Sequence, residues 1–407
     1  MTSLDLPAAD IARDGPVSAG MTGRERLAMS LIGVAAFLPL YAPQSVMPEM
    51  ATMFGVSKAA AGSVIGVTTL SVALAAPIAG PLTDRFGHKR AMLAAILLLV
   101  PLTILLSLCT SLDQVLAVRF LQGLVLPALF SGAVAYAGER WRGPIAASAT
   151  ALYVSGSALG GFAGRFITGG LWDRIGWEGS FLVLAAISAL CGLLVGAWLP
   201  KAPSRPPGSL LSHIRGMRQH LGNRRIRAAC AIGAAALFSM TATLSYVGFR
   251  LAAPPFSFSA AETGLIFLIY PLSATSTSLT APLLRRLGMR NAMRCALGLC
   301  LVGQAVLLAP HAIPVMLGLS LFVAGIFLVQ SLALGFVGRM GGHAKGAAVG
   351  LYVCCFYVGG SLGSILPGFA WNGAGWTGCV LLVMAAIGAA ALAAAALHDE
   401  PAPGTER

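Results

Sequence analysis

Long apolar runs separated by short polar segments constrain the fold of this chain more than any other feature. A helix needs about 20 mostly apolar residues to cross a bilayer. Twelve segments of the 407-residue chain meet that requirement: roughly 27–48, 58–82, 91–109, 112–138, 145–170, 179–199, 227–250, 261–284, 291–309, 313–338, 345–370 and 377–397. Only 10% of the residues are charged, whereas soluble globular domains have about 25%. The sequence therefore predicts an all-α polytopic membrane protein with 12 transmembrane helices.

An internal repeat divides the chain. Leu152-Tyr153-Val154 recurs as Leu351-Tyr352-Val353, and the same offset maps Gly160, Gly164, Trp172 and Trp177 onto Gly359, Gly363, Trp371 and Trp376. We expect two pseudo-symmetric six-helix halves, 27–199 and 227–397, with an N-terminal tail 1–26, a central loop 200–226 and a C-terminal tail 398–407. An even number of helices gives both halves the same orientation, and paired repeats around a mid-membrane site are typical of secondary transporters.

The basic residues indicate the orientation. With the N-terminus inside, inner segments hold 22 of the 27 Lys and Arg residues, outer segments hold three, and Arg119 and Arg165 lie inside apolar runs. Cytoplasmic loops carry such an excess, so we expect a multi-pass protein of the bacterial plasma (inner) membrane with both termini cytoplasmic. The first apolar run is too long for a cleavable signal. The net charge of +13 follows from this topology and does not indicate a nucleic-acid partner.

Residues that could carry catalysis or bind a metal are scarce. Gly359–Gly363 matches G-x-S-x-G, but it lies in an apolar helical run and not at a strand–turn–helix junction. Eight cysteines lie in or beside apolar runs without C-x-x-C spacing, and six histidines lie in loops or near helix ends. We therefore expect no enzymatic activity, no cofactor and no metal site.

Two motifs resemble those of a known family. Gly80-Pro-Leu-Thr-Asp84-Arg85-Phe-Gly87-His-Lys89-Arg90 is similar to the G-x-L-x-D-R-x-G-R-K-R signature of the major facilitator superfamily, and Arg119-Phe-Leu-Gln122-Gly123 resembles its R-x-x-Q-G motif. Within that family the chain looks most like the YnfM-type inner-membrane transporters of the drug and sugar efflux group. The resemblance covers essentially the whole chain. It implies a small-molecule substrate, protons as a possible coupling ion, and a monomer in the lipid bilayer.

The resemblance also implies a gate at the inner ends of the helices. In the family, the acid at the position of Asp84 caps a helix of the other half and pairs with nearby arginines, which latches the inner gate in the outward-facing state. A helix N-terminus favours an acid, and the eleventh apolar run starts near Lys345 on the same side. The expected gating residues are Gly80, Asp84, Arg85, Gly87, Lys89, Arg90, Glu139 and Arg142. Simple positive-inside anchoring is an alternative role for Lys89 and Arg90.

Two arginines lie inside apolar runs, where an unpaired cation is costly. Arg119 lies roughly 10 Å inside its helix, so it should face a cavity, a substrate or helix carbonyls. Arg165 lies nearer a helix end and can either snorkel to the surface or form a basic patch with Arg119. Helices 1, 4, 7 and 10 line the cavity in the family. By that analogy the candidate substrate-binding or coupling residues are Arg119, Gln122, Arg165, Tyr41, Gln44, Tyr246 and Gln330, with Tyr270, Tyr352, Phe356 and Tyr357 as weaker candidates.

Three glycines at four-residue spacing, Gly156, Gly160 and Gly164, allow close helix packing, which we expect at the interface between the halves. They resemble the helix-5 antiporter motif of the family, but Gly161 stands where that motif has proline, and Arg165 replaces a small residue. No Asp or Glu lies deep in an apolar run, which favours a neutral or anionic substrate over a cation.

These features predict a secondary active transporter that works by alternating access, with proton-linked efflux of a sugar, drug-like or organic anion compound as the preferred interpretation. Two alternatives stay open. One is an uptake symporter or facilitator for a small neutral or anionic solute. The other is a non-transporting membrane sensor built on a transporter scaffold.

Overall fold

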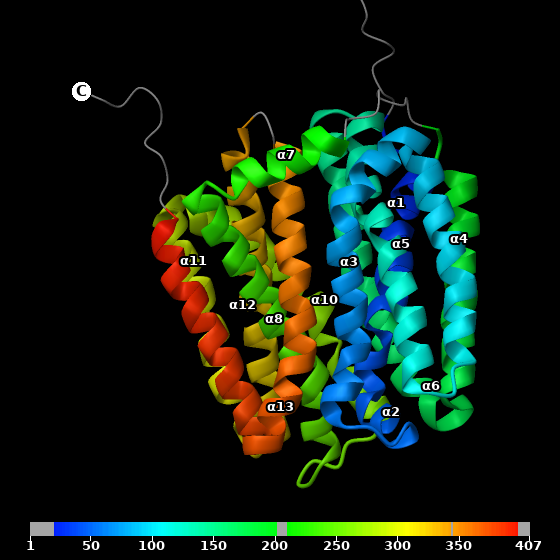
Figure 1. Ribbon diagram of the computed structural model, residues 1–407, viewed down its shortest axis with the longest axis vertical. Coiled ribbons are helices and arrows are strands. Elements are labelled where there is room, and N and C mark those ends of the chain that lie inside the picture. Colours follow the sequence, from blue (N-terminus) through cyan, green and yellow to red (C-terminus); the bar gives the residue numbers. More distant parts are fainter. Residues whose placement is uncertain (1–19, 202–209, 343–344, 398–407) are drawn as a thin grey trace, which may run out of the picture.

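The described residues of this computed structural model, 20–201, 210–342 and 345–397, form helices and no strand (Figure 1). In chain order the elements are α1 (Gly23–Tyr41), η1 (Ala42–Val46), α2 (Met47–Met53), α3 (Lys58–Phe86), α4 (His88–Ser107), α5 (Leu112–Arg140), α6 (Gly143–Trp198), α7 (Leu210–His220), α8 (Arg224–Ala252), α9 (Ala260–Ile266), α10 (Ile269–Ala274), η2 (Thr275–Leu279), α11 (Thr280–Val306), α12 (Ala312–Met340), α13 (Lys345–Ala393) and η4 (Ala394–Ala396).

Glycines turn the chain inside the longest helices. Gly176 in α6, Gly288 in α11 and Gly375 in α13 have φ values of 65°, 69° and 59°, a region that favours glycine. Among the described residues, nine helical segments are long and apolar enough to cross a membrane, and three of them run for 47 to 56 residues with one of these breaks inside. The prediction of an all-helical membrane protein is confirmed, whereas the number of 12 crossings stays a prediction.

Equivalent contacts occur in the N-terminal group of helices (α1–α6) and in the C-terminal group (α8–α13). Trp177 Nε1 donates to the carbonyl of Leu106 at 3.0 Å, and its repeat counterpart Trp376 Nε1 donates to that of Leu307 at 2.9 Å. Each indole N–H thus caps the C-terminal end of an earlier helix, because the last carbonyls of a helix lack intrahelical donors. The two copies of the sequence repeat therefore share this contact.

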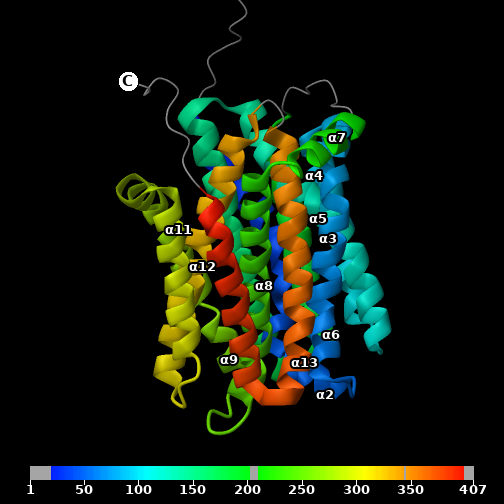
Figure 2. The ribbon, with the colours of Figure 1, turned by 60° about the vertical axis from the view of Figure 1, so that its left-hand side comes forward.

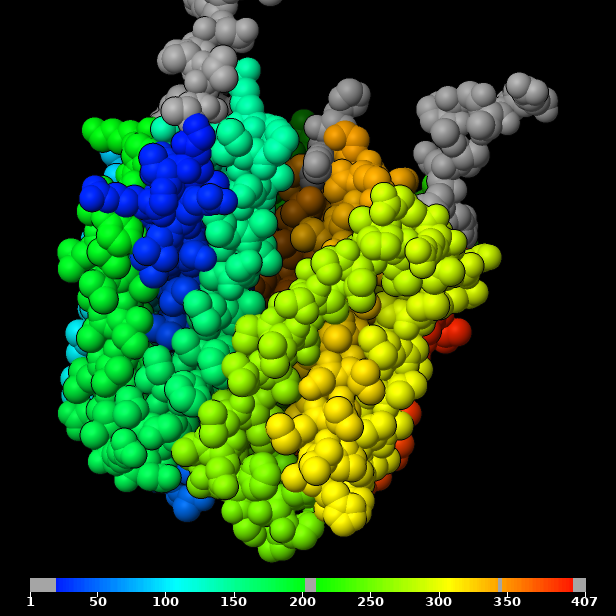
Figure 3. Space-filling model, turned by 180° about the vertical axis from the view of Figure 1, so that it is seen from behind, coloured from blue at the N-terminus to red at the C-terminus, as the bar shows by residue number. Residues whose placement is uncertain are grey.

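The two groups are separated at one end of the bundle and packed together at the other. We call the end that carries α7 and the first residues of α1 the terminal end, and the end that carries α2 and α9 the opposite end (Figures 1 and 2). Figure 3 shows a hollow between the two groups at the terminal end. At the opposite end, α3 packs on α13 and α6 packs on α9, so the hollow is closed there.

Helix α7 lies across the terminal end and contacts both groups, through α3 and α13. Its apolar side chains at Leu211 and Ile214 are 77% and 46% exposed, while His213 faces Gly350 of α13. This surface helix falls within the predicted central loop 200–226. Residues 202–209 and the C-terminal tail 398–407 lie outside the described residues.

Candidate functional site

The site begins with a break in α1. Proline at position 43 has no backbone N–H, so the carbonyl of Pro39, four residues earlier, loses its usual helical donor. The chain then tightens into the 3₁₀ helix η1, whose hydrogen bonds run over three residues and not four. That change leaves the carbonyl of Leu40 without its α-helical donor as well. Two buried backbone acceptors therefore need partners from outside the helix.

Arg119 of α5 supplies those partners. Its Nη1 donates to the carbonyl of Pro39 at 2.8 Å, its Nη2 donates to the carbonyl of Leu40, and its Nε donates to that of Val64 in α3 at 3.4 Å. The side chain of Gln122 accepts from Nη1 at 2.9 Å and donates onward to Thr103 of α4. Arg119 is fully buried, so in this conformation it holds the broken helix in place and has no surface left for a substrate.

Arg165 of α6 lies at the contact between the two groups of helices. Its Nε and Nη2 donate to Oε1 of Gln44 in η1 at 2.9 and 2.5 Å, and its Nη1 donates to the carbonyl of Gly161. Gln44 Nε2 in turn donates to Ser245 Oγ of α8 at 2.9 Å. A buried polar chain therefore runs from Arg165 through Gln44 to the C-terminal group.

Aromatic rings surround the Arg165 guanidinium. Its central carbon lies 4.8 Å from the ring centroids of Tyr41 and Phe267 and 5.0 Å from that of Tyr270, within the range of cation–π attraction. Tyr41 belongs to the N-terminal group, and the other two rings belong to the C-terminal group. Among the described residues neither Arg119 nor Arg165 forms an ion pair with a carboxylate. Two cations thus flank the α1 break without a compensating acid.

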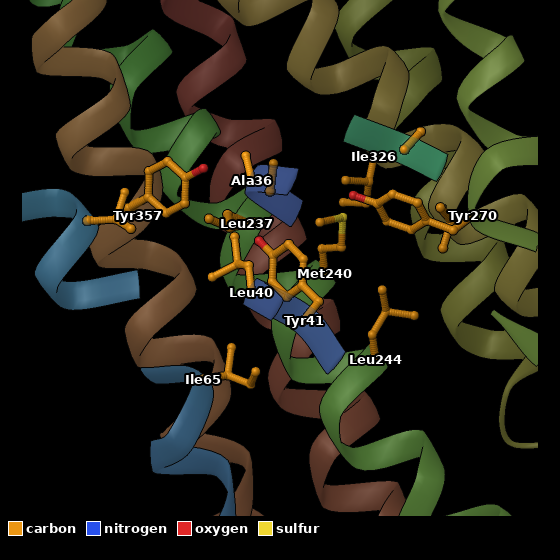
Figure 4. Packing of buried hydrophobic residues seen from close by; sticks show 14 of the residues in the cluster. Ala36, Leu40, Tyr41, Ile65, Leu237, Met240, Leu244, Tyr270, Ile326 and Tyr357 are labelled. Carbon is orange, nitrogen blue, oxygen red and sulfur yellow. The ribbon is translucent and has the colours of Figure 1, made fainter. Parts of the chain in front are cut away.

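Three tyrosine hydroxyls in this region have no hydrogen-bond partner within the described part of the chain, and two of them belong to rings that contact Arg165. The side chains of Tyr41, Tyr270 and Tyr357 retain 2%, 5% and 6% exposure, so they are nearly but not fully covered. Figure 4 shows them among apolar side chains such as Leu237 and Met240, with Tyr270 and Tyr357 reaching in from opposite sides. A buried hydroxyl normally finds a partner, so these three free donors are candidates to bind an acceptor on a ligand.

The remaining predicted binding residues lie at different depths. Gln330 of α12 is half-buried, and its Nε2 lies 3.9 Å from the sulfur of Met240. Tyr246 of α8 lies at the opposite end, where its hydroxyl donates to the carbonyl of Ser364 in α13 at 2.9 Å. The structure therefore brings Tyr41, Gln44 and Arg165 together, places Arg119 and Gln122 behind them, and keeps Tyr246 apart.

At the terminal end the predicted gating residues surround a histidine. His88 Nε2 lies 3.0 Å from Asp84 Oδ1, and His88 Nδ1 lies 2.8 Å from Glu139 Oε2. Lys89 Nζ donates to the carbonyl of Gly196, Gly87 has a φ of 83° at the turn between α3 and α4, and Arg85, Arg90 and Arg142 are exposed. Gly80 lies one turn before Asp84. His88 was not among the predicted gating residues, because the turn at Gly87 places it on another helix than Asp84, so no helical spacing brings the two side chains together.

Glycines set how closely the helices approach. Gly156, Gly160 and Gly164 face Ser30, Val34 and Leu38 of α1 in the same group; our expectation that they line the interface between the halves is therefore corrected. That interface uses other glycines. A Cβ on Gly62 of α3 would meet the carbonyl of Ser364 at 2.0 Å, and one on Gly169 of α6 would meet that of Ala260 in α9 at 2.5 Å.

Comparisons with known proteins agree with this architecture. Residues 29–253 match the model of the Major Facilitator Superfamily. The inner membrane transport protein YnfM of Escherichia coli (strain K12) is 29% identical over 377 residues, which cover 92% of this chain and 90% of that protein.

Two solved structures share the fold. The nucleoside transporter NupG superposes with a TM-score of 0.76 at 15% identity, over 91% of this chain and 99% of that one. The D-xylose-proton symporter gives a TM-score of 0.73 at 16% identity, over 91% and 96%.

Proposed function

Because the chain belongs to the major facilitator superfamily, a family of membrane transporters and not of enzymes, we propose that it exports a small organic anion with an aromatic or apolar body in exchange for protons. The observation that carries this proposal is the set of free hydroxyls on Tyr41, Tyr270 and Tyr357. Two of these rings, Tyr41 and Tyr270, lie against the Arg165 guanidinium, which is itself fully buried and has no acid partner among the described residues, so that it contributes positive charge to the site. Phenolic O–H groups and a nearby cation suit a carboxylate or another anionic acceptor.

The side chains around these hydroxyls favour an aromatic or apolar body on the substrate. Phe130 of α5 stacks on Tyr357 of α13, with ring centroids 5.8 Å apart and planes at 9°, so the two groups already meet through rings. Leu237, Met240 and Ile326 supply apolar surface around them (Figure 4). A pocket with mostly apolar walls and a few polar groups is the usual form of a small-molecule site.

The shape of the molecule supports alternating access. The hollow between the groups opens at the terminal end, while glycine contacts close the opposite end. In our proposal the halves 27–199 and 227–397 rock against each other, and the monomer lies in the bacterial inner membrane with both termini in the cytoplasm. The excess of Lys and Arg at the terminal end supports that orientation, which makes the present conformation inward-open.

One observation favours a second function. No carboxylate lies among the residues that surround Arg165, so the described site has no acid at that depth to exchange a proton. An uptake symporter or a facilitator for a small neutral or anionic solute fits this feature, and flux measurements with and without a pH gradient separate these modes from export. A sensor role is the minor alternative, and it predicts no flux.

The experiment that tests the proposed substrate class is counterflow in liposomes that contain the purified chain. The panel holds benzoate and larger aromatic carboxylates, a neutral sugar and a lipophilic aromatic cation. We expect trans-stimulated exchange for the carboxylates and none for the cation. Exchange of the cation in preference to the carboxylates would overturn the assignment.

Removing single hydroxyls tests which residues bind the substrate. Tyr270→Phe and Tyr357→Phe each delete one donor and keep the ring, so we expect each to raise the KM for the carboxylate about tenfold, since a hydrogen bond to a charged group contributes about 1.5–3 kcal/mol. Tyr136→Phe is the matched control, because the Tyr136 hydroxyl donates to the carbonyl of Pro200 away from the site. Equal KM values in all three variants would exclude the tyrosines as ligands.

A further inference from the structure

His88, Asp84 and Glu139 form a partly buried cluster at the terminal end, outside the substrate site. His88 is the first residue of α4, Asp84 lies on α3 and Glu139 lies near the end of α5. The histidine side chain is 4% exposed, and both of its ring nitrogens lie within hydrogen-bond distance of carboxylate oxygens. The imidazole therefore joins two acids that belong to different helices.

The number of protons in this cluster follows from its geometry. An ionised carboxylate can only accept hydrogen bonds, and a neutral imidazole has one N–H donor and one acceptor nitrogen. With both acids ionised and the histidine neutral, one of the two contacts would place an acceptor against an acceptor. Both contacts hold together only when the cluster carries one more proton, most simply as an imidazolium between two carboxylates.

We propose that His88, Asp84 and Glu139 are a proton-binding site that holds the terminal end of the transporter open while the proton is bound. The inference rests on the proposed function in one respect, since it identifies this proton as one of those that drive the cycle. It assigns proton binding to the terminal end of the bundle, away from the acid-free substrate site, which explains how a chain without a deep carboxylate can still respond to protons.

The two acids differ in exposure, and that difference determines which contact breaks when the proton leaves. The Asp84 side chain is 35% exposed, whereas that of Glu139 is 6% exposed. A buried carboxylate without a partner is much more costly than a half-exposed one. Glu139 therefore keeps the single donor of the neutral imidazole, and Asp84 is released. Once free, Asp84 can bind the C-terminal group when the hollow closes.

Charged groups from several helices lie around the cluster. From α1, Glu25 faces the region but is paired with Arg140 of α5 at 3.3 Å. Helix α3 contributes Arg85, and α4 contributes Lys89 and Arg90. Arg85 and Arg90 are exposed. From α7, His213 lies near Asp84. Burial lowers the pKa of His213, and the charge of Asp84 opposes that shift.

The test is the separation of the two groups as a function of pH, measured by electron–electron resonance between spin labels on the full-length chain. Gly138→Cys in α5 and Gly335→Cys in α12 carry the labels, since an added side chain meets no backbone at either position, and the exposed Cys295 is replaced by serine in every variant. The scan runs from about pH 5.5 to about pH 9, across the range in which histidine titrates.

Two substitutions at His88 test the proposal, and one at His213 is the control. We expect the unsubstituted chain to move from the long to the short distance as pH rises, with the ratio of the two populations changing at least tenfold. His88→Arg keeps a permanent cation and should hold the long distance throughout, whereas His88→Gln should hold the short one. His213→Gln is the control and should titrate as the unsubstituted chain does.

A pH response that persists in both His88 variants, or that disappears in His213→Gln, would overturn the proposal. If His88→Gln does not fold, His88→Arg still decides the question. Replacing the histidine removes the pH response only if protonation of His88 causes that response in the unsubstituted chain. The measurement uses neither solute nor gradient, so its failure is separate from failure of the transport function, which counterflow reports.

Discussion

Gly169→Leu is expected to force the opposite end of the molecule open and to reduce exchange transport by at least tenfold. A Cβ at this position would lie 2.5 Å from the carbonyl of Ala260 and 3.3 Å from the Cα of Gly264, and both neighbours are backbone atoms of α9 that cannot rotate away. Overpacking costs about 1–3 kcal/mol. Applied to one of two conformations, that cost shifts their ratio by about 5- to 150-fold.

Maleimide labelling of a cysteine at the closed contact measures the shift. Thr263→Cys places a thiol on α9 at a side chain that is 3% exposed, so labelling should be slow in the parent chain and fast after Gly169→Leu. Gly170→Leu is the matched control, because nothing lies within 4 Å of a Cβ there. Slow labelling in Gly169→Leu, or equal labelling in both variants, would show that the α6–α9 contact is not a gate.

Arg119→Leu is expected to lower the thermal stability of the protein and to abolish transport together. The substitution leaves the carbonyls of Pro39 and Leu40 buried without donors, and each such group costs about 1–3 kcal/mol. The side-chain oxygen of Gln122 loses its donor in the same step. Arg165→Leu should reduce the stability less, because the only backbone carbonyl that loses a donor is that of Gly161. It should also abolish anion transport.

The unfolding temperature in detergent, measured beside counterflow, separates the two arginines. Our account expects a large fall in stability only for Arg119→Leu. If Arg119→Leu keeps the stability of the parent chain and loses transport alone, Arg119 contacts the substrate in another conformation and its role at the α1 break is secondary. Arg119→Lys should not restore stability, because one ammonium group cannot reach all the acceptors that the guanidinium serves.

Much of the fold was predictable because lipid imposes simple rules on sequence. Apolar runs of about 20 residues must be helices, and the repeated Trp177 and Trp376 already indicate two related sets of helices in the sequence. The resemblance of the Asp84 segment to a transporter signature identified the family. The number of crossings was harder to establish, because Gly176, Gly288 and Gly375 turn the chain within continuous helical segments.

The site was predictable only in part, since it depends on contacts between distant segments. Sequence reasoning selected Tyr41, Gln44 and Arg165, but no pattern in the chain indicates that Gln44 joins Arg165 to Ser245. It treated Arg119 as a binding or coupling residue, although Pro43 in the first apolar run is a signal that carbonyls of α1 would need an outside donor. Glycine spacing alone could not distinguish packing on α1 from packing across the interface.

Accumulation of a carboxylate in liposomes under an imposed pH gradient tests the central claim most directly. The chain is inserted with a known orientation, and the solute is present at equal concentration on both sides. Our account predicts that the carboxylate accumulates on the side of the opposite end when protons are more concentrated there, and that Gly169→Leu abolishes this. Flux that follows only the gradient of the solute, or no flux for any anion, would contradict proton-linked export.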